Sequence, residues 1–84
     1  MALTKAAMIQ FSGSLEKEKN IEKSRTYIAQ AVEGGAQIIC LQELFNTTYF
    51  CYEENYDHCS LAEPVPGPTT DLVAEAAKKF GMVI

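Results

Sequence analysis

The sequence predicts an α/β fold, and three observations lead to this prediction. Apolar runs at 6–11 and 37–41 have the length of buried strands. A segment with helical spacing lies between them, and a second helical segment follows at 69–80. A third apolar run, 82–84, comes directly after that segment. The predicted order is therefore strand, helix, strand, loop, helix, strand, and we expect the strands to pair in parallel.

The first helix is predicted between Glu16 and Val32. Its apolar face, at helical spacing, consists of Ile21, Ile28, Ala31 and Val32. Ser14 is the candidate N-cap, because a serine hydroxyl can accept a hydrogen bond from a free main-chain N–H of the first turn. Gly34-Gly35 is the stop signal, because glycine readily adopts the left-handed conformation that ends helices.

Residues 42–68 form a long stretch without clear periodicity. It is rich in aromatic residues, namely Phe45, Tyr49, Phe50, Tyr52 and Tyr56. Stretches of this length are usually functional or contain short helices. The proline-rich end, 63–68, is expected to be non-helical. Thr69 or Thr70 is the expected N-cap of the second helix, which Gly81 ends. The apolar face of that helix consists of Leu72, Val73, Ala76, Ala77 and Phe80.

The composition is that of a globular protein and excludes several classes. The net charge is −4 and no lysine or arginine cluster is present, so nucleic acid is not an expected partner. No apolar run reaches the roughly 20 residues of a membrane helix, and the N-terminus lacks a secretory pattern. The three cysteines, Cys40, Cys51 and Cys59, form no disulfide framework. We therefore expect free thiols in a reducing cytoplasm.

Glu43 is the candidate for chemistry. It lies two residues past the predicted strand 37–41, at the strand end where functional groups gather in open α/β sheets. Leu41, Leu44 and Phe45 surround it, so we expect partial desolvation, which raises the pKa of a carboxyl group and suits a general base. From its position alone, Glu43 could instead be a helix N-cap or a carboxylate in a salt bridge.

Residues 42–50, with the sequence QELFNTTYF, resemble the first signature of the nitrilase superfamily. In that signature an acidic residue follows the second strand, and an aromatic pair comes six and seven positions later. Gln10-Phe11 and the segments 20–23 and 62–70 are also similar, so the resemblance covers the whole chain. It implies an α-β-β-α sandwich, of which residues 1–84 would be the N-terminal β-α-β-loop-α-β part within one carbon–nitrogen hydrolase domain.

The resemblance also implies roles for individual residues. The family acts through a Glu, a Lys and a Cys, and Glu43 matches the Glu, which serves as general base. Tyr49 and Phe50 match aromatic positions at the substrate pocket, with ordinary packing as the alternative. In the family, the catalytic lysine and cysteine lie downstream of the region that this chain matches. No residue of this chain matches either position, including Lys78, Lys79 and the three cysteines. The strand that stops after three residues also indicates a fragment, which we expect to be inactive by itself.

Gln42 stands where many family members have proline. Together with Tyr49-Phe50-Cys51, it resembles the branch that contains N-carbamoylputrescine amidases and β-ureidopropionases. This similarity implies hydrolysis of an N-carbamoyl amine or N-carbamoyl amino acid to an amine, carbon dioxide and ammonia. Amide or nitrile hydrolysis is one alternative, and a non-catalytic α/β module that binds a partner through its aromatic loop is another. The resemblance implies a small-molecule substrate, a cytoplasmic homo-oligomer, and no metal or cofactor.

The remaining polar residues of the loop suggest no further chemistry. Glu53-Glu54 and Asp57 are expected to be solvated, with binding of the cationic end of a substrate as the alternative. Cys51 and His58-Cys59 lack the paired ligand spacing of a zinc site, so we expect an exposed histidine.

Overall fold

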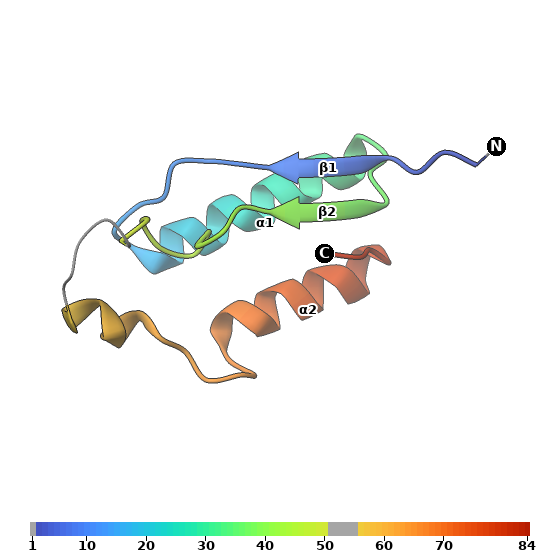
Figure 1. The fold of residues 1–84 in the computed structure, drawn as a ribbon. Helices are drawn as coiled ribbons and strands as arrows, with labels where there is room; N and C mark the ends of the chain where they lie inside the picture. The colour runs from blue at the N-terminus through green and yellow to red at the C-terminus, as the bar shows by residue number, and fades with distance from the viewer. Residues whose placement is uncertain (1, 51–55) are drawn as a thin grey trace.

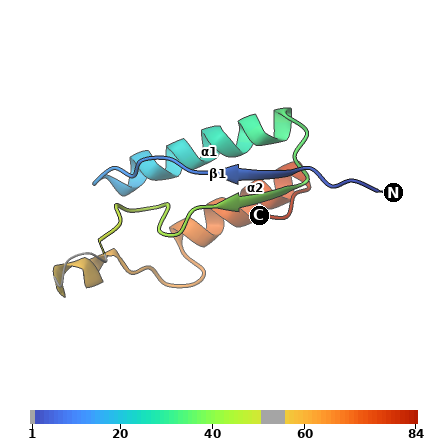
Figure 2. The ribbon, with the colours of Figure 1, turned by 45° about the horizontal axis from the view of Figure 1, so that its top comes forward.

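The computed structural model of the chain describes residues 2–50 and 56–84. Both helices lie on one side of the two strands, and α2 runs alongside α1 (Figure 1 and Figure 2). The α/β class is confirmed, with two strands and two long helices in the predicted order. The elements are β1 (Ala6–Ile9), α1 (Lys17–Glu33), β2 (Ile38–Leu41), a 3₁₀ helix (Tyr56–Leu61) and α2 (Pro68–Phe80).

The two strands pair in parallel, with Ala6 opposite Ile38. The third strand expected at 82–84 is present as a single parallel bridge between Val83 and Ile38. At this bridge the N–H of Ile39 donates to the oxygen of Val83 at 2.8 Å. The carboxyl ends of β1 and β2 therefore lie next to each other, which brings the segments that follow the two strands to the same edge of the sheet.

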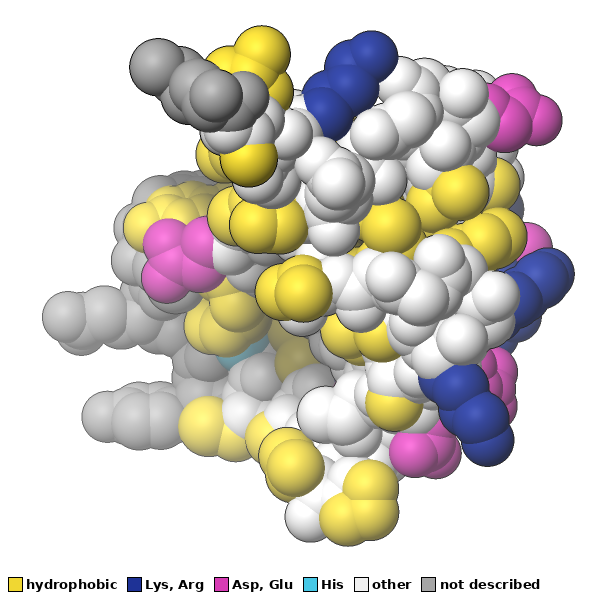
Figure 3. All heavy atoms as spheres, turned by 90° about the vertical axis from the view of Figure 1, so that its right-hand side faces the viewer, with side chains coloured by type: hydrophobic (Ala, Val, Ile, Leu, Met, Phe, Trp, Pro, Cys, Tyr) yellow, Lys and Arg dark blue, Asp and Glu magenta, His cyan; other side chains and the backbone are white. Residues whose placement is uncertain are grey.

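The core lies between the strands and the helices and consists of Ile9, Ile28, Ile39 and Ala76. Alternate residues of the strands face the other way, where Met8 is 78% and Ile38 42% exposed. In an end-on view, hydrophobic side chains extend across the middle and left of the surface, while most charged side chains in view lie along the right edge (Figure 3). The helices thus cover one face of the strands, and apolar side chains are exposed on the other.

Helix α1 begins at Lys17 without a side-chain cap. The predicted N-cap, Ser14, is wrong, because its hydroxyl accepts from the N–H of Glu16 at 3.1 Å, ahead of the helix. The predicted stop is confirmed: Gly34 is the C-cap, and Gly35 adopts a φ of 87°.

Helix α2 begins at Pro68, with Gly67 in the N-cap position. Proline suits the first helical position because its missing N–H has no partner there in any case. The predicted caps Thr69 and Thr70 are therefore wrong, although the Thr70 hydroxyl accepts from the N–H of Gly67 at 2.7 Å. Gly81, with a φ of 63°, ends the helix as predicted.

Candidate functional site

Glu43 lies two residues beyond β2, in a turn that spans residues 43–46. Its side chain is exposed. The expectation that apolar neighbours partly desolvate this carboxylate is therefore wrong for these 84 residues, because Leu44 and Phe45 are themselves only half-buried. What the fold supplies is position: the carboxylate is at the carboxyl end of a parallel strand, where α/β proteins place their functional groups.

Glu43 and Tyr49 line the same surface hollow, which has a volume of about 500 Å³. The hollow lies beyond the carboxyl ends of β1 and β2, and residues that follow each strand contribute to its walls. Tyr49 is 58% exposed, so its ring is available to a ligand. The complete lining is Gln10, Phe11, Ser12, Gly13, Gln42, Glu43, Leu44, Thr47, Thr48 and Tyr49.

Phe50 lies outside this lining. Its ring stacks on the ring of His58, with centroids 5.1 Å apart. His58 is half-buried within the 3₁₀ helix, so the expectation of a solvent-exposed histidine is wrong. Of the predicted site residues, the structure therefore brings Glu43 and Tyr49 together and leaves Phe50 apart.

Gln42, the residue before Glu43, connects the ends of the two strands. Its side-chain oxygen accepts a hydrogen bond from the N–H of Phe11 at 2.6 Å. β1 ends at Ile9 although the apolar run continues to Phe11, and the N–H of Phe11 has this side-chain acceptor beyond the paired strands. A proline at position 42 could not accept this bond through its side chain.

The turn that carries Glu43 has an unusual backbone. Leu44 has a φ of 56°, in the left-handed region that costs a non-glycine residue roughly 1–2 kcal/mol. The N–H of Thr47 donates to the oxygen of Leu44 at 3.3 Å and closes the turn. Residues in this conformation persist only where the surrounding structure holds them, and they are common at functional sites.

Gly13, in the loop between β1 and α1, packs directly against this turn. A Cβ atom at Gly13 would lie 2.6 Å from the main-chain oxygen of Thr47, closer than atoms can approach. The absence of a side chain therefore allows the loop to pack against Thr47, which is buried. Gly13 and Thr47 both line the hollow, so this contact helps to shape it.

A buried asparagine fixes the same two segments. The side chain of Asn20 has no solvent exposure; its Nδ2 donates to the oxygens of Ser14 at 2.8 Å and Asn46 at 3.0 Å. Its Oδ1 accepts from the N–H of Ser14 at 2.6 Å. Sequence reasoning did not give Asn20 this role. The available signal was its spacing, because Asn20, Ser24 and Ile28 are four residues apart and all three are fully buried.

The side chain of Asn46 connects the turn to the N-terminus of α2. Its Nδ2 donates to Oε2 of Glu63 at 3.1 Å and to the hydroxyl of Thr69 at 2.8 Å. Glu63 also accepts from the N–H of Thr69 at 2.8 Å and from its hydroxyl at 2.7 Å, and it pairs with Lys17 at 2.9 Å. One carboxylate thus joins α1, the turn and α2.

The environment of Glu63 favours its charged form. Burial raises the pKa of this carboxyl group, but the hydrogen bonds from Thr69 and the hydrogen bond and charge of Lys17 outweigh burial and lower the pKa to about 2. Glu63 is therefore ionised throughout the physiological pH range. Its hydrogen bonds come from Asn46 and Thr69, and it does not line the hollow.

The other predicted residues lie away from the hollow. Cys40 and Cys59 are free and exposed thiols in β2 and the 3₁₀ helix. Lys78 and Lys79 are exposed at the end of α2, as predicted for a helix surface. Tyr52, Cys51 and Glu53-Glu54 lie outside the described residues. Within residues 2–50 and 56–84, no group of three or more histidine, cysteine, aspartate or glutamate side chains could hold a metal ion.

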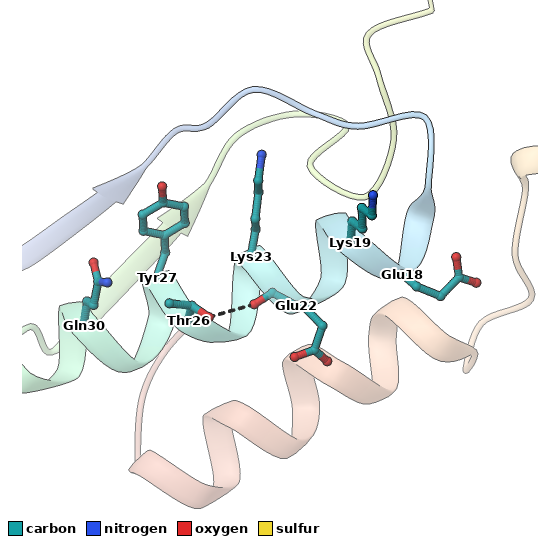
Figure 4. Close-up of a pocket in the computed structure, with 7 residues that line it drawn as sticks. All are labelled: Glu18, Lys19, Glu22, Lys23, Thr26, Tyr27 and Gln30. Atoms are coloured by element: carbon teal, nitrogen blue, oxygen red, sulfur yellow. Dashed lines mark hydrogen bonds between the residues drawn. The ribbon is translucent and has the colours of Figure 1, made fainter.

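A second hollow runs along the outer surface of α1 (Figure 4). Its lining residues all come from this one helix, and their charged groups point in different directions, Lys23 away from Glu18 and Glu22. Because these polar groups do not point toward one common ligand position, we assign no binding site to this surface. Of the helices in the described part of the chain, none has the length and apolar character to cross a membrane.

Comparisons with known proteins agree over almost the whole chain. The family model described as carbon-nitrogen hydrolase matches residues 5–84. Omega-amidase NIT2-A of Xenopus laevis is 35% identical over 85 residues, which are 100% of this chain and 29% of that protein. N-carbamoylputrescine amidase of Solanum lycopersicum is 34% identical over 83 residues, 98% of this chain and 28% of that protein.

A further relative, citrullinase of Francisella tularensis subsp. tularensis, is 33% identical over 85 residues, 100% of this chain and 30% of that protein. No solved structure matches the chain. The chain spans less than a third of the length of these curated relatives.

Proposed function

This chain belongs to the carbon-nitrogen hydrolase family of the nitrilase superfamily, and we propose that it is the N-terminal part of an enzyme that hydrolyses an N-carbamoyl amine or N-carbamoyl amino acid. One observation carries the proposal. In a chain that matches the family from 5 to 84, Glu43 follows β2 and shares a hollow with Tyr49. The N-carbamoyl preference is supported by Gln42 and by the similarity to N-carbamoylputrescine amidase.

In the proposed mechanism Glu43 is the general base. It takes the proton from a cysteine thiol, and the thiolate attacks the carbonyl carbon of the substrate. A lysine stabilises the oxyanion of the tetrahedral intermediate. The nitrogen leaves with a proton, and Glu43 then activates a water molecule that cleaves the thioester. For an N-carbamoyl substrate, one water is consumed, and an amine, carbon dioxide and ammonia are released. The lysine and cysteine come from outside residues 1–84, so this chain alone is inactive.

Tyr49 and Phe50 are the proposed substrate-binding residues. Tyr49 has the stronger geometric support, because its ring shares the hollow with Glu43. Phe50 is included through its place in the signature, and its ring stacks on His58. We further propose that the whole protein is a homo-oligomer and that it is cytoplasmic. The free thiols of Cys40 and Cys59 fit a reducing compartment.

A substrate comparison tests the N-carbamoyl assignment. The complete protein that contains this chain is assayed with N-carbamoylputrescine, an N-carbamoyl amino acid, an ω-amide and a nitrile. We expect the highest kcat/KM for one of the two N-carbamoyl compounds. A preference for the amide, the class named for omega-amidase NIT2-A, would assign the alternative specificity within the same chemistry.

The second candidate function is a non-catalytic module that binds a partner. The observation that favours it is the exposed apolar face of the strands, where Met8 is 78% exposed. A sharp, cooperative thermal transition of a monomeric 84-residue chain would support this function. Aggregation or a molten state would support the enzyme fragment.

A further inference from the structure

We propose that Asn46 is a positioning residue for Glu43, because it holds the turn 43–46 in the arrangement that places the Glu43 carboxylate at the hollow. The inference rests on the proposed function, in which Glu43 is the general base. Asn46 touches no reacting atom and acts only through the backbone that it shares with Glu43.

Asn46 is bound from two directions. Its main-chain oxygen accepts a hydrogen bond from the fully buried Asn20 of α1 at 3.0 Å. Its side-chain nitrogen donates to Glu63 at 3.1 Å and to Thr69 at 2.8 Å, at the start of α2. Glu43 and Asn46 are the two ends of one turn. Movement of Asn46 therefore moves the carboxylate relative to the hollow.

The turn needs this support because its backbone is strained. Leu44, the residue after Glu43, has a φ of 56°. A non-glycine residue leaves the left-handed region when the contacts that enforce it are removed. Without the Asn46 side chain, the turn keeps the hydrogen bond between Thr47 and Leu44 at 3.3 Å and the bond from Asn20 to its main-chain oxygen at 3.0 Å. It loses its connection to Glu63 and Thr69 at the start of α2.

The partner of Asn46 is itself held in place. Glu63 is fixed by Lys17 at 2.9 Å and by two hydrogen bonds from Thr69. Burial raises the pKa of Glu63, but these contacts outweigh burial and lower the pKa to about 2. The Glu63 carboxylate is therefore ionised at neutral pH. The bond from Asn46 to Glu63 is thus a bond to a fixed charge, which is stronger than one between neutral groups.

The experiment uses the complete enzyme and compares kcat, KM and Tm of four variants. Asn46→Ala removes both donated bonds. Thr69→Val is close to isosteric and removes the hydroxyl that accepts from Asn46. Ile28→Val is the control, a change in the buried core that should lower Tm without altering the hydrogen bonds of the turn. Glu43→Gln tests the general base itself.

We expect Asn46→Ala to lower kcat roughly 10- to 100-fold with KM changed less than threefold, because small misplacements of a catalytic group cost up to about 100-fold. Thr69→Val should lower kcat in the same sense by a smaller factor. Ile28→Val should lower Tm and leave kcat within twofold of the wild type.

Three results distinguish a failure of positioning by Asn46 from a failure of the proposed function. If Glu43→Gln is inactive while Asn46→Ala and Thr69→Val keep kcat within threefold of the wild type, positioning by Asn46 is wrong and the proposed function stands. The same conclusion follows if Ile28→Val loses as much kcat as Asn46→Ala. If Glu43→Gln keeps its activity, the proposed role of Glu43 fails, and the inference fails with it.

Discussion

The side-chain amide of Asn20 donates a hydrogen bond to the main-chain oxygen of Asn46 at 3.0 Å, from a position without solvent exposure. The two residues lie on α1 and on the turn after β2. Asn20 also bonds Ser14, in the loop after β1. One buried side chain therefore connects the segments that follow both strands, and these segments form the hollow that contains Glu43.

Replacing Asn20 should destabilise the fold. Asn20→Ala removes three hydrogen bonds and leaves the N–H of Ser14 and the oxygens of Ser14 and Asn46 without this partner. We expect the free energy of unfolding of the complete protein to fall by about 2–3 kcal/mol in urea denaturation. Thr26→Ala is the matched control, because the Thr26 hydroxyl donates to the oxygen of Glu22 at 3.1 Å on the exposed surface of α1. Its effect should stay within about 0.5 kcal/mol. Equal losses in the two variants would contradict the role of Asn20.

A methyl group at Gly13 should disturb the turn. Gly13→Ala places a Cβ atom 2.6 Å from the oxygen of Thr47, so either the loop or the turn must move. We expect a loss of about 1–3 kcal/mol in the free energy of unfolding, as for other overpacked sites. Gly34→Ala is the control, because its Cβ atom would meet its neighbours at 3.5 Å and its φ of −73° suits alanine. A Gly13→Ala variant as stable as Gly34→Ala would show that the packing is looser than described.

The contribution of Glu63 to stability should depend on pH. The pKa of Glu63 is lowered from 4.5 to about 2 in the folded chain. Because the folded pKa is below the unfolded value, the unfolded chain binds the proton more readily as the pH falls. The stabilisation is therefore fully present above pH 4.5 and is lost as the pH falls through the window down to about 2.

Glu63→Gln tests this dependence. The variant lacks the charge, so the difference in unfolding free energy between wild type and variant should be largest near neutral pH, at most about 3 kcal/mol. It should shrink steadily between pH 4.5 and 2. A difference that stays constant over this window would mean that the Glu63 carboxylate is not stabilised by its partners in the folded chain.

Local patterns in the sequence predicted most of the fold. The apolar runs and helical spacing gave both strands and both helices within a few residues, and Gly81 marked the end of α2. The predicted cap Ser14 failed because its hydroxyl accepts from the N–H of Glu16, ahead of the first turn of α1. The predicted cap Thr69 failed because α2 already begins at Pro68. Thr69 binds Glu63, six positions earlier, and this pairing depends on how the proline-rich segment folds back.

The candidate site was predicted in part. The place of Glu43 follows from a rule about strand ends, which sequence periodicity can locate. The hydrogen bonds that join α1, the turn and α2 were not predictable, because they connect residues distant in sequence. Lys17 and Leu61, for example, share a hydrogen bond of 2.9 Å across 44 positions. The expected desolvation of Glu43 was wrong, because apolar neighbours in sequence do not have to cover a side chain in a turn.

The most direct measurement of the central claim is the first turnover of the complete enzyme with Glu43 replaced by Gln. Glutamine preserves the shape of the side chain but cannot accept a proton from a thiol. If Glu43 is the general base, the rate of ammonia release in the first turnover should fall by a factor of about 10²–10⁴, while thermal unfolding shows a folded protein. A first-turnover rate within threefold of the wild type would contradict the assignment of Glu43.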